Sequence, residues 1–101
     1  MSTKSMSLKT AVLLTVIGEA FLQSHITHLM QSLGATGFTL TPAQGFGRHG
    51  YRMGDVAGYN TNIEIKTIVS QDISNQIFSA LTELQAKHAL IAFKQNVEVL
   101  F

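Results

Sequence analysis

The chain of 101 residues has no cysteine and no tryptophan, and it contains a single proline. Without cysteine it has no disulfide framework, no thiolate nucleophile and no redox switch, which is typical of proteins in a reducing cytoplasm. Charged residues make up only 13% of the chain, about half of the usual share of roughly 25%. Because a small domain needs a polar shell, this shortage of charge predicts that another subunit covers part of its surface.

No charge of one sign dominates either. The net charge is +1 at pH 7, so the chain has no basic field that would favour a nucleic acid as partner. The apolar run over residues 11–17 is too short to span a bilayer and lacks a signal-peptide cleavage pattern. We therefore expect a cytoplasmic protein with a single domain over residues 8–101, preceded by a loose Ser/Thr/Met-rich segment over residues 1–7.

The hydrophobic pattern predicts the element order βαββαβ, followed by a short terminal strand. Strands are expected over residues 8–17, 37–43, 62–69 and 89–93, with a further short strand over residues 97–100. Apolar stripes with helical spacing predict helices over residues 19–33 and from about residue 70 to residue 84, the second one capped by Ser70 or Asp72. This is the ferredoxin-like α+β arrangement, in which both helices cover one face of an antiparallel sheet.

The first predicted strand is apolar on both of its faces. A strand with one wet face would alternate more cleanly between apolar and polar side chains. Both faces of this strand are therefore expected to be covered, one by the helices and one by another copy of the chain. The two apolar sets are Val12, Leu14 and Val16 on one face, and Ala11, Leu13 and Ile17 on the other.

A glycine-rich stretch in the middle of the chain carries the clearest chemical signal. Gly34 ends the first helical pattern, and Gly37 would allow a sharp re-entry into the second strand. Gly45 and Gly47 leave backbone N–H groups open to an anion, and Arg48 adds a planar fork of donors that suits a phosphate. The stretch indicates an anion site, with a hairpin-like bend carrying a solvated arginine as the alternative.

Residues 45–61 contain five glycines and show no apolar period, so they are expected to form one long loop. A loop of this length in so small a domain is usually functional.

The remaining titratable residues give weaker signals. His25 and His28 could share one face of a helix, but no third ligand lies near them in the sequence, and solvent-facing histidines are the favoured interpretation. Lys87 and His88 precede the last predicted strand, where they could face a cleft between subunits. The carboxylates form no pair at catalytic spacing, and no serine lies in a nucleophile elbow. We therefore expect neither a metal site nor enzyme activity.

The order of the central residues resembles a known family. Gly-Ala-Thr-Gly-Phe-Thr-Leu-Thr, beginning at Gly34, followed by Gly-Phe-Gly-Arg, ending at Arg48, is similar to the second strand and T-loop entry of the PII signalling proteins. The resemblance extends over most of residues 8–100, including the segments at 62–66 and 97–100. It implies a ferredoxin-like homotrimer with its sheets facing inward and a T-loop at about residues 45–61. It also implies an adenine nucleotide, such as AMP, ADP, ATP or cyclic AMP, bound as a ligand between subunits, with no other cofactor.

The same resemblance implies roles for individual residues. Thr39 would reach the base, Gly45, Gly47 and Arg48 would hold phosphates, and Lys87 and His88 are further candidates for nucleotide binding. The loop would engage a target, and the resemblance implies a membrane transporter, such as one for bicarbonate. Its candidate contact residues are His49, Tyr51, Arg52, Asp55 and Tyr59.

The chain also departs from the family pattern. PII proteins carry a second glycine–lysine loop before the last strand, whereas residues 84–89 contain no glycine, and the arginines expected after the last strands are missing before Phe101. These departures are similar to those of the divergent PII-like proteins associated with bicarbonate transporters or carboxysomes. They leave open an alternative, a CutA-like trimeric module with a structural or metal-linked role and no nucleotide sensing.

Overall fold

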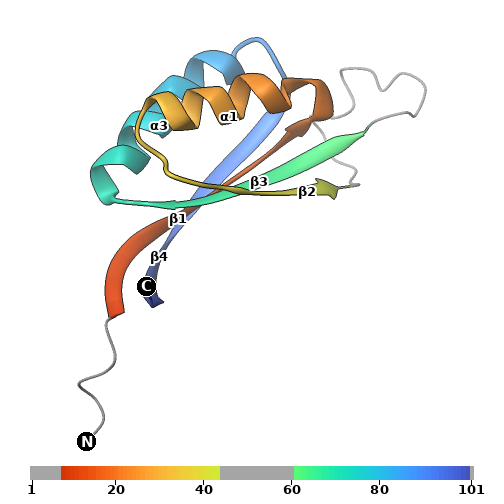
Figure 1. The fold of residues 1–101 in the computed structure, drawn as a ribbon. Helices are drawn as coiled ribbons and strands as arrows, with labels where there is room; N and C mark the ends of the chain where they lie inside the picture. Colours follow the sequence, from red (N-terminus) through yellow and green to blue (C-terminus); the bar gives the residue numbers. More distant parts are fainter. Residues whose placement is uncertain (1–7, 44–60, 101) are drawn as a thin grey trace, which may run out of the picture.

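A computed structural model describes residues 8–43 and 61–100. Within these ranges, β1 (Leu8–Glu19), β2 (Thr39–Ala43), β3 (Asn62–Val69) and β4 (Leu90–Leu100) form one antiparallel sheet in the order β2-β3-β1-β4. Helices α1 (Gln23–Ser32) and α3 (Gln71–Gln85) lie on one face of this sheet, and the 3₁₀ turn η2 (Ala20–Leu22) joins β1 to α1 (Figure 1). The predicted ferredoxin-like α+β fold is therefore confirmed.

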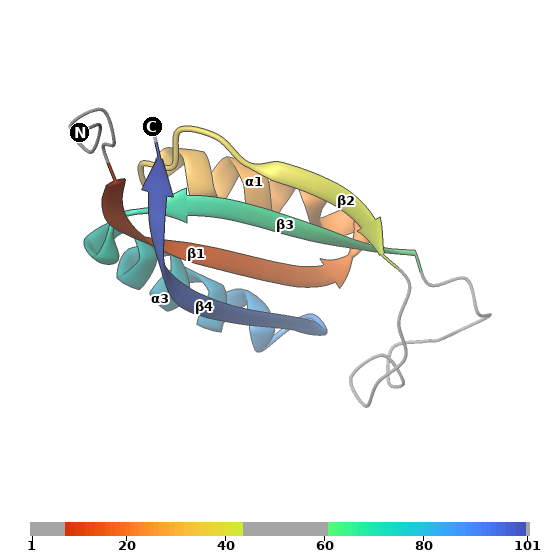
Figure 2. The same cartoon turned by 90° about the horizontal axis from the view of Figure 1, so that it is seen from below.

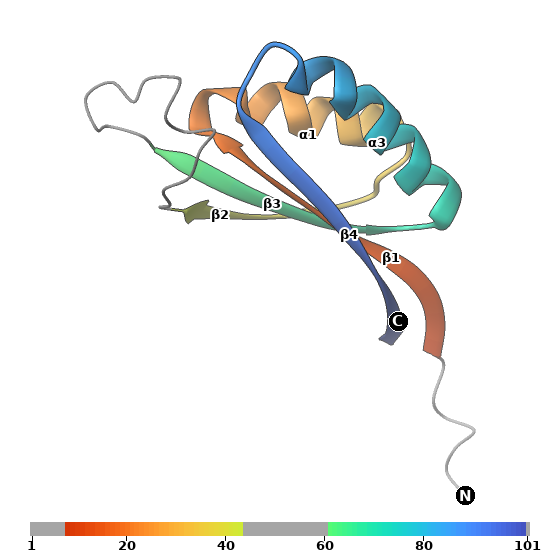
Figure 3. The same cartoon turned by 180° about the vertical axis from the view of Figure 1, so that it is seen from behind.

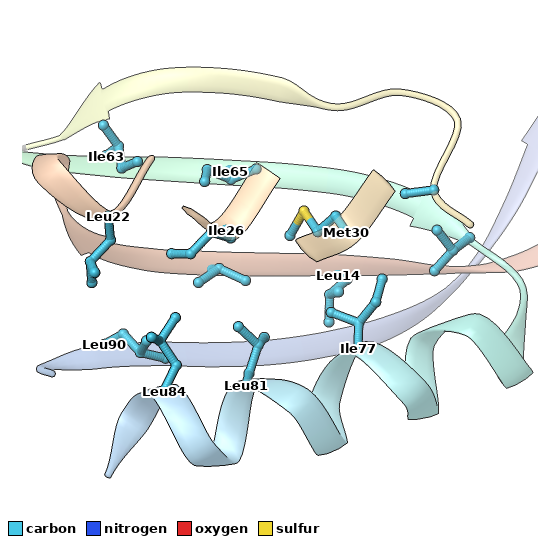
Figure 4. Close-up of a cluster of buried hydrophobic side chains, with 13 residues drawn as sticks. Leu14, Leu22, Ile26, Met30, Ile63, Ile65, Ile77, Leu81, Leu84 and Leu90 are labelled. Atoms are coloured by element: carbon cyan, nitrogen blue, oxygen red, sulfur yellow. The ribbon is translucent and has the colours of Figure 1, made fainter. Parts of the chain in front are cut away.

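The core lies between the sheet and the two helices. Val12, Leu14 and Val16 of β1 are buried on the helix side, as the apolar pattern of this strand predicted. Ile26 and Met30 of α1 and Ile77 of α3 are also fully buried and belong to the same cluster as Leu14 and Val16 (Figure 4). The predicted stripes of the two helices thus face the core, and burial of these side chains is the main stabilising term.

Strand β4 differs from the prediction. The sequence pattern suggested two strands, over residues 89–93 and 97–100, but the structure has one continuous strand. The reason is that the first residues of β1 pair with the last residues of β4, with Leu8 opposite Leu100. Because β3 ends at Val69, opposite Val12, the two partners continue alone beyond the helices as a two-stranded arm, residues 8–11 and 97–100 (Figures 1 and 3).

The helix boundaries also shift slightly. Strand β1 continues to Glu19, so the predicted helix over residues 19–33 begins with the 3₁₀ turn and becomes α-helical only at Gln23. Of the two candidate caps for α3, Ser70 takes the role, because its hydroxyl accepts a hydrogen bond of 3.2 Å from the N–H of Ile73. Asp72 instead lies in the first turn, where its carboxylate suits the positive end of the helix.

The two glycines between α1 and β2 have different roles. Gly34 has a φ of +118°, a conformation that L side chains rarely adopt, and it ends the helical segment as predicted. A Cβ added there would lie 2.9 Å from Cδ1 of Ile73. Gly37 has no left-handed φ, and a Cβ added there would meet open space, so the prediction that it supplies conformational freedom was wrong. Its carbonyl instead accepts a 2.6 Å hydrogen bond from the Thr67 hydroxyl.

This difference gives a matched pair of substitutions. Gly34→Ala should lower the free energy of unfolding by about 1–3 kcal/mol, because it adds both backbone strain and a contact with Ile73. Gly37→Ala should change the free energy of unfolding by less than about 0.5 kcal/mol. Urea unfolding curves measure both values. Equal losses for the two variants would contradict the roles assigned to these glycines.

The face of the sheet opposite the helices is not covered by any described element (Figure 2), and it carries an apolar patch beside the charged residues Glu64 and Lys66. We call this surface the open face. Its most exposed large side chains are Ile68, Ile91 and Phe93, each more than 40% exposed, and Leu13 and Ile17 of β1 lie between them. The second apolar face predicted for β1 is thus present in the described part of the chain.

Candidate functional site

The end of β2, the start of β3 and the end of β1 lie side by side in one row of the sheet. Residues 44–60 connect β2 to β3 at this row. Ala43 of β2 pairs with Asn62 of β3, and Asn62 pairs with Glu19 of β1. The chain leaves this row after Ala43 and returns to it at Thr61. The N–H of Ala20 donates a 2.9 Å hydrogen bond to the carbonyl of Thr61, which ties the point of return to η2. We call this row the loop-bearing edge.

The turn between α3 and β4 meets the same edge. Leu90 pairs with Gly18, so the preceding turn, residues 86–89, lies beside the end of β1. Two hydrogen bonds hold this turn, because the N–H groups of Lys87 and His88 both donate to the carbonyl of Leu84 at 3.0 Å. The side-chain amide of Gln85 donates a further one, also 3.0 Å long, to the carbonyl of Leu90. Lys87 and His88 are thereby fixed at the loop-bearing edge.

An aromatic contact joins this turn to η2. The ring of His88 lies edge-on to the ring of Phe21, with 5.7 Å between the centroids and an interplanar angle of 74°. Such edge-to-face pairs contribute about 0.5–1.5 kcal/mol beyond the area they bury. Phe21 lies on η2 directly after Ala20, whose N–H binds Thr61, so one short turn contacts both the returning loop end and the α3–β4 turn.

The structure places three of the predicted nucleotide-binding residues. Thr39 is exposed at the start of β2, the outermost strand, and pairs with Lys66. It lies four residues before Ala43, roughly 13 Å along the strand from the loop-bearing edge. Lys87 is exposed at that edge and His88 is half-buried there. The other predicted site residues lie outside the described ranges: Gly45, Gly47 and Arg48 for the phosphates, and His49, Tyr51, Arg52, Asp55 and Tyr59 for the partner.

A pocket of about 520 Å³ opens at the loop-bearing edge, between η2, α1 and the paired ends of β2 and β3. Its described lining contains amide and hydroxyl groups but no charged side chain. A phosphate bound nearby would therefore need its cationic partners from the α3–β4 turn or from residues 44–60. The lining consists of Ala20, Gln23, Leu40, Pro42, Ala43, Thr61, Asn62 and Ile63.

Glu19 is the residue of this edge that no sequence motif marked. Its Oε1 atom is buried and accepts no hydrogen bond from any described residue. Buried polar atoms are usually paired, so an unpaired carboxylate oxygen calls for an explanation. The sequence could not have marked it, because the burial of this oxygen depends on its surroundings in the folded chain.

The two helix histidines do not form part of the site. His25 and His28 are exposed on α1, in agreement with the solvent-facing interpretation. Over residues 8–43 and 61–100, no group of three His, Cys, Asp or Glu side chains is arranged to hold a metal ion. In the same residues, no helix has the length and apolar character needed to cross a membrane.

The described residues thus form a ferredoxin-like sheet with a long connection between β2 and β3, and Lys87 and His88 lie at the same edge of this sheet, beyond β1. The chain matches the family described as nitrogen regulatory protein P-II over residues 11–100. This match covers most of the sequence, and the chain belongs to that family. A comparison with curated proteins finds no match.

Solved structures agree with this assignment. The PII-like signalling protein TTHA0516 from Thermus thermophilus is 32% identical to this chain, with a TM-score of 0.79 and coverage of 93% of this chain and 92% of that one. CPII from Thiomonas intermedia, in its structure with ADP, AMP and acetate, is 20% identical, with a TM-score of 0.81 and coverage of 93% and 92%. A CPII structure with ADP, AMP and bicarbonate is also 20% identical, with a TM-score of 0.79 and coverage of 92% and 96%. The resemblance to PII proteins is thereby confirmed.

Proposed function

We propose that this chain is a signal-transduction regulator that senses an adenine nucleotide bound between neighbouring copies of itself. The observation that carries the proposal is the loop-bearing edge. Ala43 and Thr61, which flank residues 44–60, lie at its β2 and β3 end, and the turn that holds Lys87 and His88 lies at its other end, beyond β1. A ligand at this edge would touch the loop and the folded domain together. CPII, which shares the fold, is bound to ADP and AMP in its solved structures.

The copies would form a homotrimer through the open face. Ile68, Ile91 and Phe93 leave an apolar surface on the sheet that a second copy would bury. The low share of charged residues fits the same arrangement, since buried interface cores are depleted in charge. The clefts that bind the nucleotide would then lie where the loop-bearing edge of one copy meets the neighbouring copy.

Within a cleft, Thr39 would contact the base, and the N–H groups of Gly45 and Gly47 would join Arg48 on the phosphates. The α3–β4 turn has no glycine to wrap a phosphate, so its part would fall to Lys87 and His88. Both of these side chains start from the loop-bearing edge. The lysine ammonium would attract the phosphate as a charge, and the imidazole of His88 would donate a hydrogen bond, instead of backbone groups enclosing the phosphate.

The signal would pass through residues 45–61 to a target protein in the cytoplasm, with contacts from His49, Tyr51, Arg52, Asp55 and Tyr59. The nucleotide would bias this loop only if it binds one loop conformation more tightly than the others. The hydrogen bond between Ala20 and Thr61 gives the folded domain a direct link to the returning loop end. We infer a membrane transporter, such as one for bicarbonate, as the target, and a regulator without enzymatic activity.

One observation favours a different function. The α3–β4 turn, residues 86–89, lacks the glycines that wrap a phosphate in PII proteins. A trimer that had lost nucleotide binding would be a CutA-like structural or metal-linked module. Such a module would have the same open face and the same assembly.

A thermal-shift panel separates the two functions. At a hundredfold excess over Kd, a ligand stabilises the folded state by about 2.7 kcal/mol. For a small domain this should raise Tm by roughly 10–20 °C. We expect a shift of this size with at least one of AMP, ADP, ATP and cyclic AMP, and none with UMP as the control. If no adenine nucleotide raises Tm, the structural module replaces the regulator.

A further inference from the structure

We propose that the two-stranded arm, residues 8–11 and 97–100, binds a neighbouring copy of this chain, and that its two strands pair stably only in that contact. The inference rests on the assembly in the proposed function. It adds a second contact between copies, at the opposite end of β1 from the loop-bearing edge. Formation of the arm and assembly of the chains would then be one coupled event.

The arm has little support from its own chain. β3 ends at Val69, opposite Val12, while the pairing of β1 with β4 continues as far as Leu8–Leu100. At about 3.4 Å per residue, the arm extends roughly 13 Å beyond the end of β3. The helices do not follow it there (Figure 3), and within the described sheet this part has two strands only. Because a two-stranded ribbon is at best marginally stable in water, the arm needs contacts from outside the chain.

A hollow lies between the arm and the body of its own domain. Its volume is about 420 Å³, and Gln71, the first residue of α3, is the helical residue that lines it. The strand residues of the lining are Thr10, Ala11, Val12, Asn96, Val97 and Glu98. The side of the arm that faces the helices is therefore not packed against α3.

The arm nevertheless carries apolar side chains on both of its faces. Leu8 and Leu100 lie opposite each other on the side of the helices, where 49% and 67% of their surfaces are exposed. Ala11 and Val97 form a pair on the other side and are half-buried. An apolar ribbon that is exposed to water promotes association with other chains. The composition of the arm thus indicates a surface that is covered in the assembled protein.

A second copy of the chain is the partner that these observations favour. Ala11 and Val97 continue the open face beside Leu13, so a copy that covers the open face also reaches the arm. The arm contributes one charge of each sign, Lys9 and Glu98, and so gives no field that would select a strongly basic or acidic partner. β4 is also the last strand of the described sheet on its side, and such an edge is a template for pairing with another chain.

Leu100→Glu tests the contact between the arm and the neighbouring copy. In the assembly the new carboxylate would be buried, so we expect the concentration at which half of the chains are assembled to rise about tenfold to a hundredfold. Phe21→Glu is the matched control, because Phe21 is 68% exposed, as Leu100 is 67% exposed, but lies on η2 at the loop-bearing edge. The control should assemble like the wild type. Analytical ultracentrifugation over a dilution series measures all three proteins, and circular dichroism checks that they fold.

Hydrogen exchange tests the coupling without a substitution in the arm. It compares the assembled wild type with the Phe93→Glu variant, which should be monomeric and whose substitution lies outside residues 97–100. We expect the backbone N–H groups that join the two strands of the arm to exchange at least about a hundredfold faster in the monomer. The N–H groups of residues 14–16, in the centre of the sheet, should stay protected in both proteins.

The two measurements separate this inference from the proposed function. An unchanged assembly concentration in Leu100→Glu would overturn the contact of the arm and leave the wild-type assembly in place. Arm N–H groups that exchange equally slowly in the monomer would overturn the coupling in the same way. A wild type that stays monomeric at micromolar concentration would overturn the proposed assembly as well.

Discussion

Replacing Phe93 by glutamate should break the assembly into single chains of 11.0 kDa. Phe93 lies on the open face with 43% of its surface exposed, so the isolated chain tolerates a charge there. In the proposed trimer the same carboxylate would be buried in the interface between copies, which costs several kcal/mol in each of three contacts. Light scattering during size exclusion measures the mass, which for the wild type should be near three times 11.0 kDa.

Phe21→Glu is the control for this experiment. Phe21 is 68% exposed, more than Phe93, but it lies on η2 at the loop-bearing edge and outside the open face. It should leave the trimer mass unchanged, while circular dichroism checks that both variants fold. A wild type that is monomeric at micromolar concentration would remove the assembly, and with it the clefts of the proposed function.

Arg48→Ala should weaken adenine-nucleotide binding by roughly tenfold to a hundredfold and leave the trimer intact. A hydrogen bond between charged groups contributes about 1.5–3 kcal/mol, and few other cations are available to replace it. At the loop-bearing edge, the described residues offer the ammonium of Lys87 and the imidazole of His88. Calorimetry with AMP, ADP and ATP measures the loss, with the mass determined in parallel.

Arg48→Lys tests the chemical basis of this effect. Lysine keeps the charge but loses the planar fork that binds two phosphate oxygens at once, so it should restore only part of the affinity. Equal affinity of wild type and Arg48→Ala for all three nucleotides would remove the phosphate role assigned to Arg48.

The architecture could be predicted from the sequence because its elements have clear periods. β1 carries an apolar pattern on both faces, and α3 carries an apolar stripe through Ile77, Leu81 and Leu84, all three buried in the core. These patterns depend on local spacing, which the sequence displays directly. The alternation of apolar and polar residues likewise predicted β3, in which Ile63 and Ile65 face the core.

The errors arose where the structure depends on pairing between distant residues. The long β4 exists because residues 8–11 pair with residues 97–100, a register that no local pattern contains. For Gly37, we predicted a conformational role from its residue type. A Cβ added there would contact nothing, so the position does not require glycine. The carbonyl of Gly37 accepts the hydrogen bond from the Thr67 hydroxyl. Gly34 was predicted correctly, because a glycine after the last apolar position of a helix is a common termination signal.

The candidate site was predictable only in part for the same reason. The glycine–arginine stretch and the pair Lys87 and His88 stood out by residue type. The contact between His88 and Phe21 joins residues 67 positions apart in the chain, by the difference of their numbers, and the unpaired oxygen of Glu19 depends on its surroundings in three dimensions. Neither property has a signature in a single sequence.

The central claim is that an adenine nucleotide binds between copies of this chain. It is tested most directly by titrating AMP and ADP into the wild-type trimer and into the monomeric Phe93→Glu variant by calorimetry. We predict binding to the trimer with one nucleotide per chain, and a loss of at least a hundredfold in affinity for the monomer, because half of each cleft is missing. Equal binding by the monomer, or no binding by the trimer, would contradict the claim.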